Sequence, residues 1–105
     1  MDKTAIDFYT RLARGLAALF GSNCEIVIHD LESNDVEHSI VAIENGYITG
    51  RKLGDGPSQA VLDAIMGEDR AEDHISYLTH TEDGKILRST TIYIRNDEDK
   101  IEGVF

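Results

Sequence analysis

Two groups of polar residues interrupt apolar runs in this chain. His29 and Asp30 close the first run, and Arg88, Ser89 and Thr90 lie within a later one. An imidazole, a carboxylate and a hydroxyl are the side chains of a hydrolase triad. However, consecutive strand residues point to opposite faces, so His29 and Asp30 cannot both reach one site unless the strand bends. No Ser or Cys lies in a G-x-S-x-G setting. The sequence therefore predicts no catalytic residues and no enzyme.

The later group suggests a binding site. With a period of two, residues 86, 88, 90, 92 and 94 share one strand face, and three of them are isoleucines. This face is therefore expected to meet the core, and a buried arginine needs a partner. Asp30 shares its own face with apolar residues 24, 26 and 28. One hypothesis pairs Arg88 with Asp30 or with a carboxylate-bearing ligand, with Thr90 assisting. The alternative is a salt bridge at the rim of the strand.

The other reactive side chains form weaker patterns. His74 and His80 would share a strand face, but nothing at ligand spacing completes a metal site. The glycine-rich segment 50–56 matches neither a dinucleotide fingerprint nor a phosphate-binding loop. Cys24 lies in an apolar run and is expected to be an inert core residue. The sequence predicts no metal and no cofactor, and its single cysteine fits a reducing, cytoplasmic location.

Length and charge restrict the classes of function. The 105 residues fit a single domain, residues 1–105, with 41% hydrophobic residues. Twenty acidic against ten basic residues give a net charge of −10, which repels phosphate groups. We therefore expect that these residues do not bind DNA or an anionic membrane. The N-terminus lacks a signal-peptide pattern, and no apolar run approaches the ~20 residues that span a bilayer.

Periodicity predicts an α+β fold. Apolar residues at spacings of three and four predict a helix over about residues 4–20, ended by Gly21. The sheet and its connector then occupy about residues 23–105. Strands are predicted at 24–30, 37–44, 74–81, 85–95 and from 101 onward, with a short helix opened by Pro57 and closed by Gly67. This order suits an antiparallel five-stranded sheet with helices packed on one face.

The segment after the second strand has two interpretations. Asn45 and Gly46 between apolar runs are typical of a two-residue hairpin. Three further glycines crowd the supposed partner strand, which favours a loop. Arg51 in this segment is interpreted either as a solvated cation, which we favour, or as an anion-binding residue near the start of the helix at Pro57.

Three long stretches resemble a known family. They are EIVIHDLES, SIVAIENGYITGRKLGDGPS and DGKILRSTTIYIRNDEDKIEGVF, and the resemblance runs from about Ala5 to Phe105. They resemble the YheO-like PAS domain family, in which a PAS-like domain forms the N-terminal half of a bacterial transcriptional regulator and precedes a helix-turn-helix. A D-arginine utilisation repressor is one relative. The resemblance implies a five-stranded sheet in the order 2-1-5-4-3, a small-molecule pocket, and a loop at Asn45.

The chain departs from that family in two ways. The helix-turn-helix segment is absent from this sequence, so DNA binding is expected only through residues outside it. The family's last strand also runs beyond Phe105, so we expect the sequence to stop inside that strand. Because most members have no identified ligand, the resemblance carries over no ligand set. The candidate ligand-binding residues are His29, Asp30, Asn45, Arg51, Arg88, Ser89 and Thr90.

The leading expectation is a ligand-sensing or regulatory PAS-like domain. It would bind an unknown small molecule and pass a population shift to a DNA-binding segment that this sequence lacks. Because PAS modules often dimerise, the resemblance also implies a homo-oligomer. The alternative is an interaction or dimerisation scaffold with a filled core and no ligand. A pocket lined by polar side chains distinguishes the two.

Overall fold

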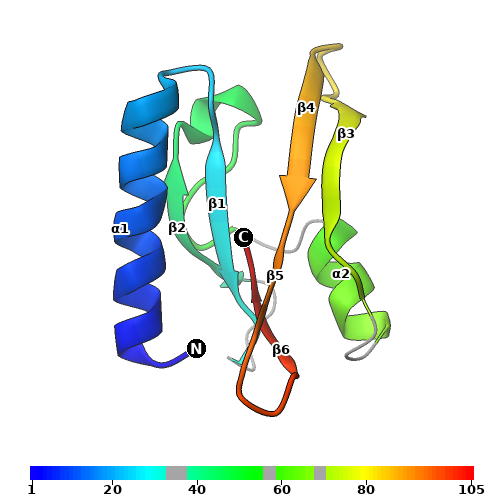
Figure 1. Ribbon diagram of the computed structural model, residues 1–105. Coiled ribbons are helices and arrows are strands. Elements are labelled where there is room, and N and C mark those ends of the chain that lie inside the picture. The colour runs from blue at the N-terminus through cyan, green and yellow to red at the C-terminus, as the bar shows by residue number, and fades with distance from the viewer. Residues whose placement is uncertain (33–37, 56–58, 68–70) are drawn as a thin grey trace.

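The computed structural model describes residues 1–32, 38–55, 59–67 and 71–105 (Figure 1). The helices and strands, in chain order, are α1 (Lys3–Phe20), β1 (Ile26–Asp30), β2 (Ile40–Glu44), the 3-10 turn η2 (Gly46–Ile48), α2 (Gln59–Met66), β3 (His74–His80), β4 (Ile86–Thr91), β5 (Tyr93–Arg95) and β6 (Ile101–Val104). The predicted N-terminal helix is confirmed. The predicted start of the second strand at residue 37 and the predicted helix start at Pro57 lie outside the described residues.

Helix α1 is fixed at both ends by local hydrogen bonds. The side chain of Asp2 accepts a hydrogen bond from the Ala5 N–H at 2.8 Å, which caps the first turn. Gly21 ends the helix with φ of 93°, and its N–H donates to the carbonyl of Ala17. Ala13 and Ala17 are buried, and their small side chains allow the helix to pack closely on β1 and β2.

The strands form two antiparallel sheets. One has the order β2-β1-β6-β5, and the other is the hairpin β3-β4. The predicted strand 85–95 is interrupted at Ile92, which separates β4 from β5. Within the described residues, six strands in two sheets therefore replace the single five-stranded sheet, while the α+β class is confirmed. When β4 and β5 are counted as one interrupted strand, the order is the one that the family resemblance implied.

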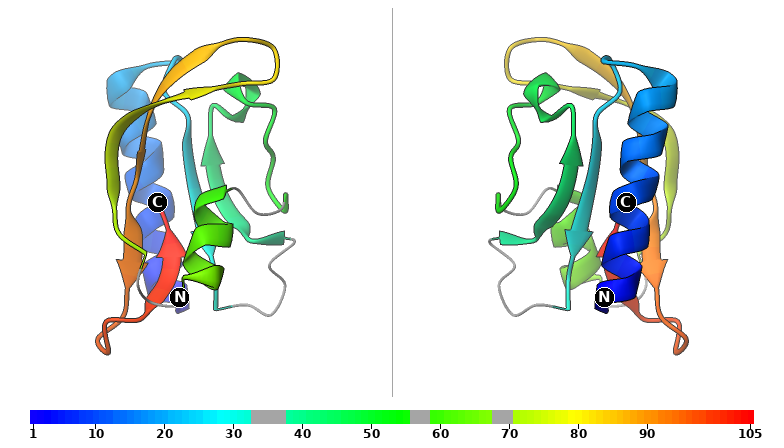
Figure 2. Two further views of the ribbon diagram at one scale, coloured as in Figure 1. Left: turned by 90° about the vertical axis from the view of Figure 1, so that its right-hand side faces the viewer. Right: turned by 90° about the vertical axis from the view of Figure 1, so that its left-hand side faces the viewer.

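The two helices cover opposite faces of the larger sheet (Figure 2). On one face, α1 packs on a core that contains Ile28 and Ile94. On the other face, Val61 and Ala64 of α2 pack on Tyr93 and Val104. Tyr93 and Ile94 are consecutive strand residues, so they must point to opposite sides. The expected placement of helices on one face is thus replaced by a three-layer arrangement with the sheet in the middle.

The predicted core face of β4 is wrong. Ile86 is 67% exposed, and Arg88 and Thr90 are exposed as well. The physical reason is the position of α1, which packs on β1 and β2. The opposite face of β4, which ends at the buried Thr91, is the one turned toward the interior.

The loop interpretation at Asn45 is confirmed. Asn45 has φ of 56° and leads into η2, and Gly50 has φ of 81°. A Cβ at Gly46 would collide with the carbonyl oxygen of Arg51, so glycine is required where the loop turns back on itself. The loop therefore brings Arg51 back beside the end of β2.

The burial pattern predicts a contrast between two isoleucines. Ile28→Ala should lower the free energy of unfolding by about 2–5 kcal/mol, because Ile28 is fully buried and its loss leaves a cavity. Ile86→Ala should cost less than about 0.5 kcal/mol, since the side chain is largely in solvent. Urea unfolding followed by circular dichroism measures both. Equal losses would contradict the assignment of faces.

Candidate functional site

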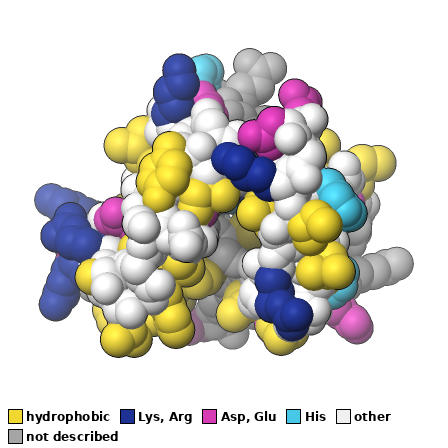
Figure 3. All heavy atoms as spheres, turned by 90° about the horizontal axis from the view of Figure 1, so that it is seen from above, with side chains coloured by type: hydrophobic (Ala, Val, Ile, Leu, Met, Phe, Trp, Pro, Cys, Tyr) yellow, Lys and Arg dark blue, Asp and Glu magenta, His cyan; other side chains and the backbone are white. Residues whose placement is uncertain are grey.

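A large cleft lies between β1 and the β3-β4 hairpin. Its volume is about 2040 Å³, and Figure 3 shows a hollow between hydrophobic side chains when the molecule is seen from above. Both α1 and α2 contribute to the lining, which shows that the cleft reaches both sides of the sheet layer. Its polar lining residues include Glu25, His29, Thr49, Arg51, Thr79 and Ser89.

The alternation of β1 determines what this strand presents to the cleft. Ile26 and Ile28 point into the core under α1. Glu25, Val27 and His29 have the opposite parity, and all three line the cleft. One strand thus supplies an apolar core face and a mixed polar face.

His29 is a buried, neutral imidazole. It is 3% exposed, and its Nδ1 is 2.8 Å from the hydroxyl of Ser39, which is 1% exposed. Burial, with a smaller effect from the positive charge of Arg51, lowers the pKa of His29 from 6.5 to about 4. The ring makes no other hydrogen bond to the described residues. Because Ser39 is shielded from solvent, the pair serves to orient the imidazole and not to attack a substrate.

Arg51 provides a cation at the same wall. Its side chain is exposed, and no carboxylate of the described residues lies within ion-pair distance of its guanidinium. Glu25 is nearby, and its Oε1 accepts a hydrogen bond from Thr49 Oγ1 at 2.6 Å. Burial raises the pKa of Glu25, and the Thr49 hydrogen bond and the charge of Arg51 offset only part of this effect. A guanidinium that has no carboxylate partner in the described part of the chain can orient a polar ligand.

The opposite wall consists of hydroxyl groups. Thr79 on β3 and Ser89 on β4 are bonded to each other with their Oγ atoms 2.8 Å apart. Tyr77 and Thr91 form a second cross-strand pair at 2.6 Å. Hydroxyls both donate and accept, so this wall can adapt to a neutral or charged polar group. The predicted candidate Ser89 therefore lines the cleft on its inner side, as do His29 and Arg51.

The structure does not bring Arg88 and Asp30 together, so that predicted pair is wrong. Asp30 Oδ1 is 2.8 Å from the amino group of Met1, on the side of the sheet covered by α1. Arg88 Nη1 donates to the hydroxyl of Ser76 at 3.0 Å, and the Oγ1 of Thr90 accepts from the Ser76 N–H. Arg88 and Thr90 line the outer edge of the cleft on β4. Because both side chains are exposed, solvent stabilises the charge of Arg88. A hydrogen bond to the neutral Ser76 is then sufficient, and no buried ion pair is needed.

Asn45 does not line the cleft; its side chain bonds to the segment between α1 and β1. Its Nδ2 donates to the carbonyl of Cys24 at 2.7 Å and to that of Gly21 at 3.3 Å. These bonds tie the end of β2 to the connection between α1 and β1. Cys24 is half-buried and packs against the core under α1. The observed contacts of Asn45 thus support a structural role.

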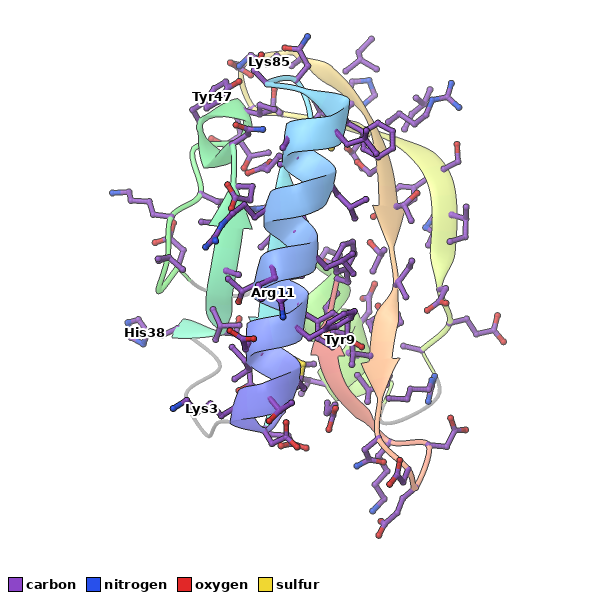
Figure 4. All side chains as sticks on the ribbon, turned by 60° about the vertical axis from the view of Figure 1, so that its left-hand side comes forward. Lys3, Tyr9, Arg11, His38, Tyr47 and Lys85 are labelled. Carbon is purple, nitrogen blue, oxygen red and sulfur yellow. The ribbon has the colours of Figure 1, made fainter. Side chains whose placement is uncertain are left out.

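At one end of the cleft, η2 contacts the β3-β4 turn and the connection between α1 and β1. Lys85 Nζ donates to the carbonyl of Ile48 at 3.4 Å, and the Tyr47 hydroxyl donates to the carbonyl of Ser22. Figure 4 shows Tyr47 and Lys85 at the same end of the molecule. The Lys85 contact connects the hairpin tip to the loop that carries Thr49 and Arg51, and the Tyr47 contact connects that loop to the segment that follows α1.

Sequence reasoning missed Glu25, Ser39 and Thr49. The parity of Glu25 with His29 could have placed it at the site, because a strand alternates strictly. Ser39 and Thr49 lie outside regular strands, and no sequence pattern indicated their contacts. Among the described residues, no group of three or more His, Cys, Asp or Glu is arranged to hold a metal ion. No helix in the described ranges is long and apolar enough to cross a membrane.

Comparison with known proteins assigns the family. A family model described as the YheO-like PAS domain matches residues 1–105. The chain belongs to the YheO-like PAS domain family. It is 37% identical over 108 residues to the uncharacterized protein YheO of Escherichia coli K12, an alignment that covers 98% of this chain and 44% of that protein. An uncharacterized protein of Haemophilus influenzae is 33% identical over 103 residues, which cover 98% of this chain and 46% of the relative. The chain thus spans less than half the length of these relatives.

The lowered pKa of His29 predicts an acid-sensitive contribution to stability. Between pH 6.5 and about pH 4 the unfolded state binds the proton and the folded state does not, so stability falls as the pH falls through this range. The loss in the free energy of unfolding is on the order of 3 kcal/mol at low pH, and it is absent above pH 6.5. Urea unfolding at pH 4, 5.5 and 7 should show a smaller loss in His29→Gln than in wild type.

His80→Gln is the matched control, because His80 is exposed and the variant should keep the acid sensitivity of wild type. The same titration can be followed by NMR of the imidazole protons. A midpoint near pH 6.5 for His29 would contradict the buried, neutral assignment.

Proposed function

We propose that this PAS-like domain senses a small polar molecule in the cleft and regulates a bacterial transcription factor of the helix-turn-helix class. The single observation that carries the proposal is the set of polar side chains on the cleft wall: Arg51, which has no carboxylate partner among the described residues, the neutral His29 and the hydroxyls of Thr79 and Ser89. A few convergent polar groups in a concave site are typical of small-molecule binding. The family assignment to a PAS domain supports the same class of function.

Arg51 favours a ligand that carries an acidic group. A guanidinium forms two parallel hydrogen bonds with a carboxylate, and Arg51 has no such partner among the described residues. His29 is neutral, so it can bond to the ligand without adding charge. Acidic residues elsewhere in the lining, such as Asp63 and Asp73, disfavour large polyanions.

Binding would act through the β3-β4 hairpin. A ligand that contacts both walls favours conformations in which the hairpin lies close to β1, and this shifts the population of hairpin positions. The hairpin continues through Ile92 into β5, which pairs with β6. We infer that this route carries the signal to a DNA-binding segment outside these residues. The charge of −10 disfavours direct DNA contact by the domain itself.

A second candidate function is a dimerisation scaffold. Leu19 is 75%, Phe20 68% and Phe8 54% exposed, and all three lie on α1. Exposed apolar side chains on one helix favour contact with a second copy. The two functions are compatible, since a homodimer could also bind a ligand in each cleft. If light scattering shows a monomer at micromolar to millimolar concentration, dimerisation is excluded as a function of this domain.

The ligand proposal predicts selective stabilisation by small carboxylates. In a thermal-shift assay with a panel of small carboxylic acids, an active compound at 100 times its Kd should stabilise wild type by about 2.7 kcal/mol. Arg51→Gln should weaken binding by about 10–100-fold, because it removes a charge-assisted hydrogen bond. The Tm of the unliganded variant should stay close to that of wild type, since Arg51 is exposed.

Arg11→Gln provides the control. Arg11 lies on α1, as Figure 4 shows, and it does not line the cleft. Its Nη1 is 3.8 Å from Oδ2 of Asp7. The control should bind the same compound as strongly as wild type. The proposal fails if no carboxylate stabilises wild type, or if both arginine variants lose binding equally.

A further inference from the structure

The residue before β2 brings a hydroxyl group to His29. The pairing of β1 and β2 shifts by one residue between Ile28 and His29, so His29 lies opposite Ile40. The carbonyl of Ser39 then accepts a hydrogen bond from the Asp30 N–H at 2.9 Å, and the Ser39 hydroxyl lies 2.8 Å from His29 Nδ1. Register shifts of this kind re-aim side chains beside functional sites. Here the shift places a buried hydroxyl at one nitrogen of a buried imidazole.

The hydroxyl of Ser39 determines which ring nitrogen is bare. Its one hydrogen-bond partner in the described part of the chain is His29 Nδ1. Ser39 is buried, so solvent offers its proton no other acceptor. If Nδ1 carried the ring proton, it would donate to the hydroxyl oxygen, and the buried hydroxyl proton would have no acceptor. An unsatisfied buried donor costs about 1–3 kcal/mol. The hydroxyl therefore donates to Nδ1, which is the bare nitrogen.

The proton of the neutral imidazole is then on Nε2. A neutral ring has one N–H and one bare nitrogen, and the bond made by one nitrogen fixes the state of the other. Among the described residues, every buried side-chain nitrogen or oxygen that is shut off from solvent has a hydrogen-bond partner. Nε2 has no such partner, so it must be reachable from outside, and His29 lines the cleft. The Nε2–H group is therefore open to the cleft.

The wall around this N–H adds further donors. The residues opposite His29 on the two neighbouring strands, Ile40 and Val104, are buried and apolar. The positive charge of Arg51 lowers the pKa of the ring, which places the guanidinium within range of His29, and a guanidinium has donors and no acceptor. Glu25 lies on the same face of the chain four residues earlier, and four extended residues span about 13 Å. The polar groups at this point of the cleft therefore suit an acceptor.

We propose that the Nε2–H of His29 is a hydrogen-bond donor site in the cleft and that Ser39 is the positioning residue that fixes the proton there. The ligand group that fits is an oxygen without a proton, such as that of a carboxylate or a ketone. An ammonium group does not fit, because it has donors only. As a ligand contact this N–H rests on the proposed function and adds a second point of contact to Arg51. The position of the proton is a property of the unliganded protein and does not depend on that function.

NMR of the isotope-labelled, unliganded protein at pH 7 tests the position of the proton. In long-range proton–nitrogen spectra a bare ring nitrogen and a protonated one have well-separated shifts, and sequential assignment identifies the ring of His29. Wild type should show a bare Nδ1 and a protonated Nε2. Ser39→Ala should move the Nδ1 shift toward that of the solvent-exposed His80, whose ring averages over both forms. Ser39→Thr keeps the hydroxyl and should restore the wild-type shift.

Thr10→Ala is the control for the loss of a hydroxyl. The Thr10 hydroxyl donates to the carbonyl of Ile6 within α1 and does not line the cleft, so the variant should leave both ring nitrogens of His29 unchanged. Two small probes then test the donor site itself. Sodium acetate should shift the Nε2 signal of wild type, whereas methylammonium chloride at the same ionic strength should not. The acetate response should be smaller in Ser39→Ala.

A protonated Nδ1 in wild type would overturn the proposal, and this result needs no variant to fold. Equal responses of Nε2 to acetate and methylammonium, or an unchanged Nδ1 shift in Ser39→Ala, would overturn it as well. Failure of the proposed function gives a different result. If no carboxylate stabilises wild type in the thermal-shift assay, the position of the ring proton still stands, and a protonated Nδ1 would leave a carboxylate contact at Arg51 intact.

Discussion

The strict alternation of β1 is the constraint on which the rest of the structure depends. This strand lies between β2 and β6, and α1 covers one of its faces. Ile28 is fully buried on that face, while His29, one residue later, must point to the other. The core packing and the cleft wall therefore lie on opposite sides of the same five residues. A shift of one residue would put the imidazole under α1 and an isoleucine into the cleft.

The electrostatics of the cleft follow from the cost of burying charge. His29 is nearly inaccessible to solvent, so it is neutral and bonded to Ser39. Arg51 stays charged at an exposed position, where its guanidinium needs no protein partner. The glycine at position 46 makes this arrangement possible, because only a residue without Cβ lets the loop return to Arg51. The cleft lining therefore combines one neutral buried group with one solvent-exposed cation.

Local sequence patterns predicted the helix and the loop correctly, but they did not predict which layers pack against each strand. The helix over 4–20, its end at Gly21 and the loop at Asn45 depend on neighbouring residues, and all three were correct. Which face of β4 is buried depends on the layer that covers it. The three isoleucines led to the wrong prediction, because α1 packs on β1 and β2 and leaves their face of β4 exposed. Asp30 finds its partner in the amino group of Met1, 29 residues away, which no spacing rule could indicate. Of the predicted site residues, His29, Arg51 and Ser89 line the inner cleft, whereas Asn45 is engaged in structural contacts.

The central claim is that the polar wall around His29 and Arg51 holds a small molecule. Native mass spectrometry of the protein purified from its own cells tests this most directly, because it preserves noncovalent complexes and needs no prior choice of ligand. The account predicts a bound mass of metabolite size that is present on wild type and absent from Arg51→Gln. A mass equal to that of the polypeptide alone, unchanged after incubation with a small-molecule extract of the same cells, would contradict it.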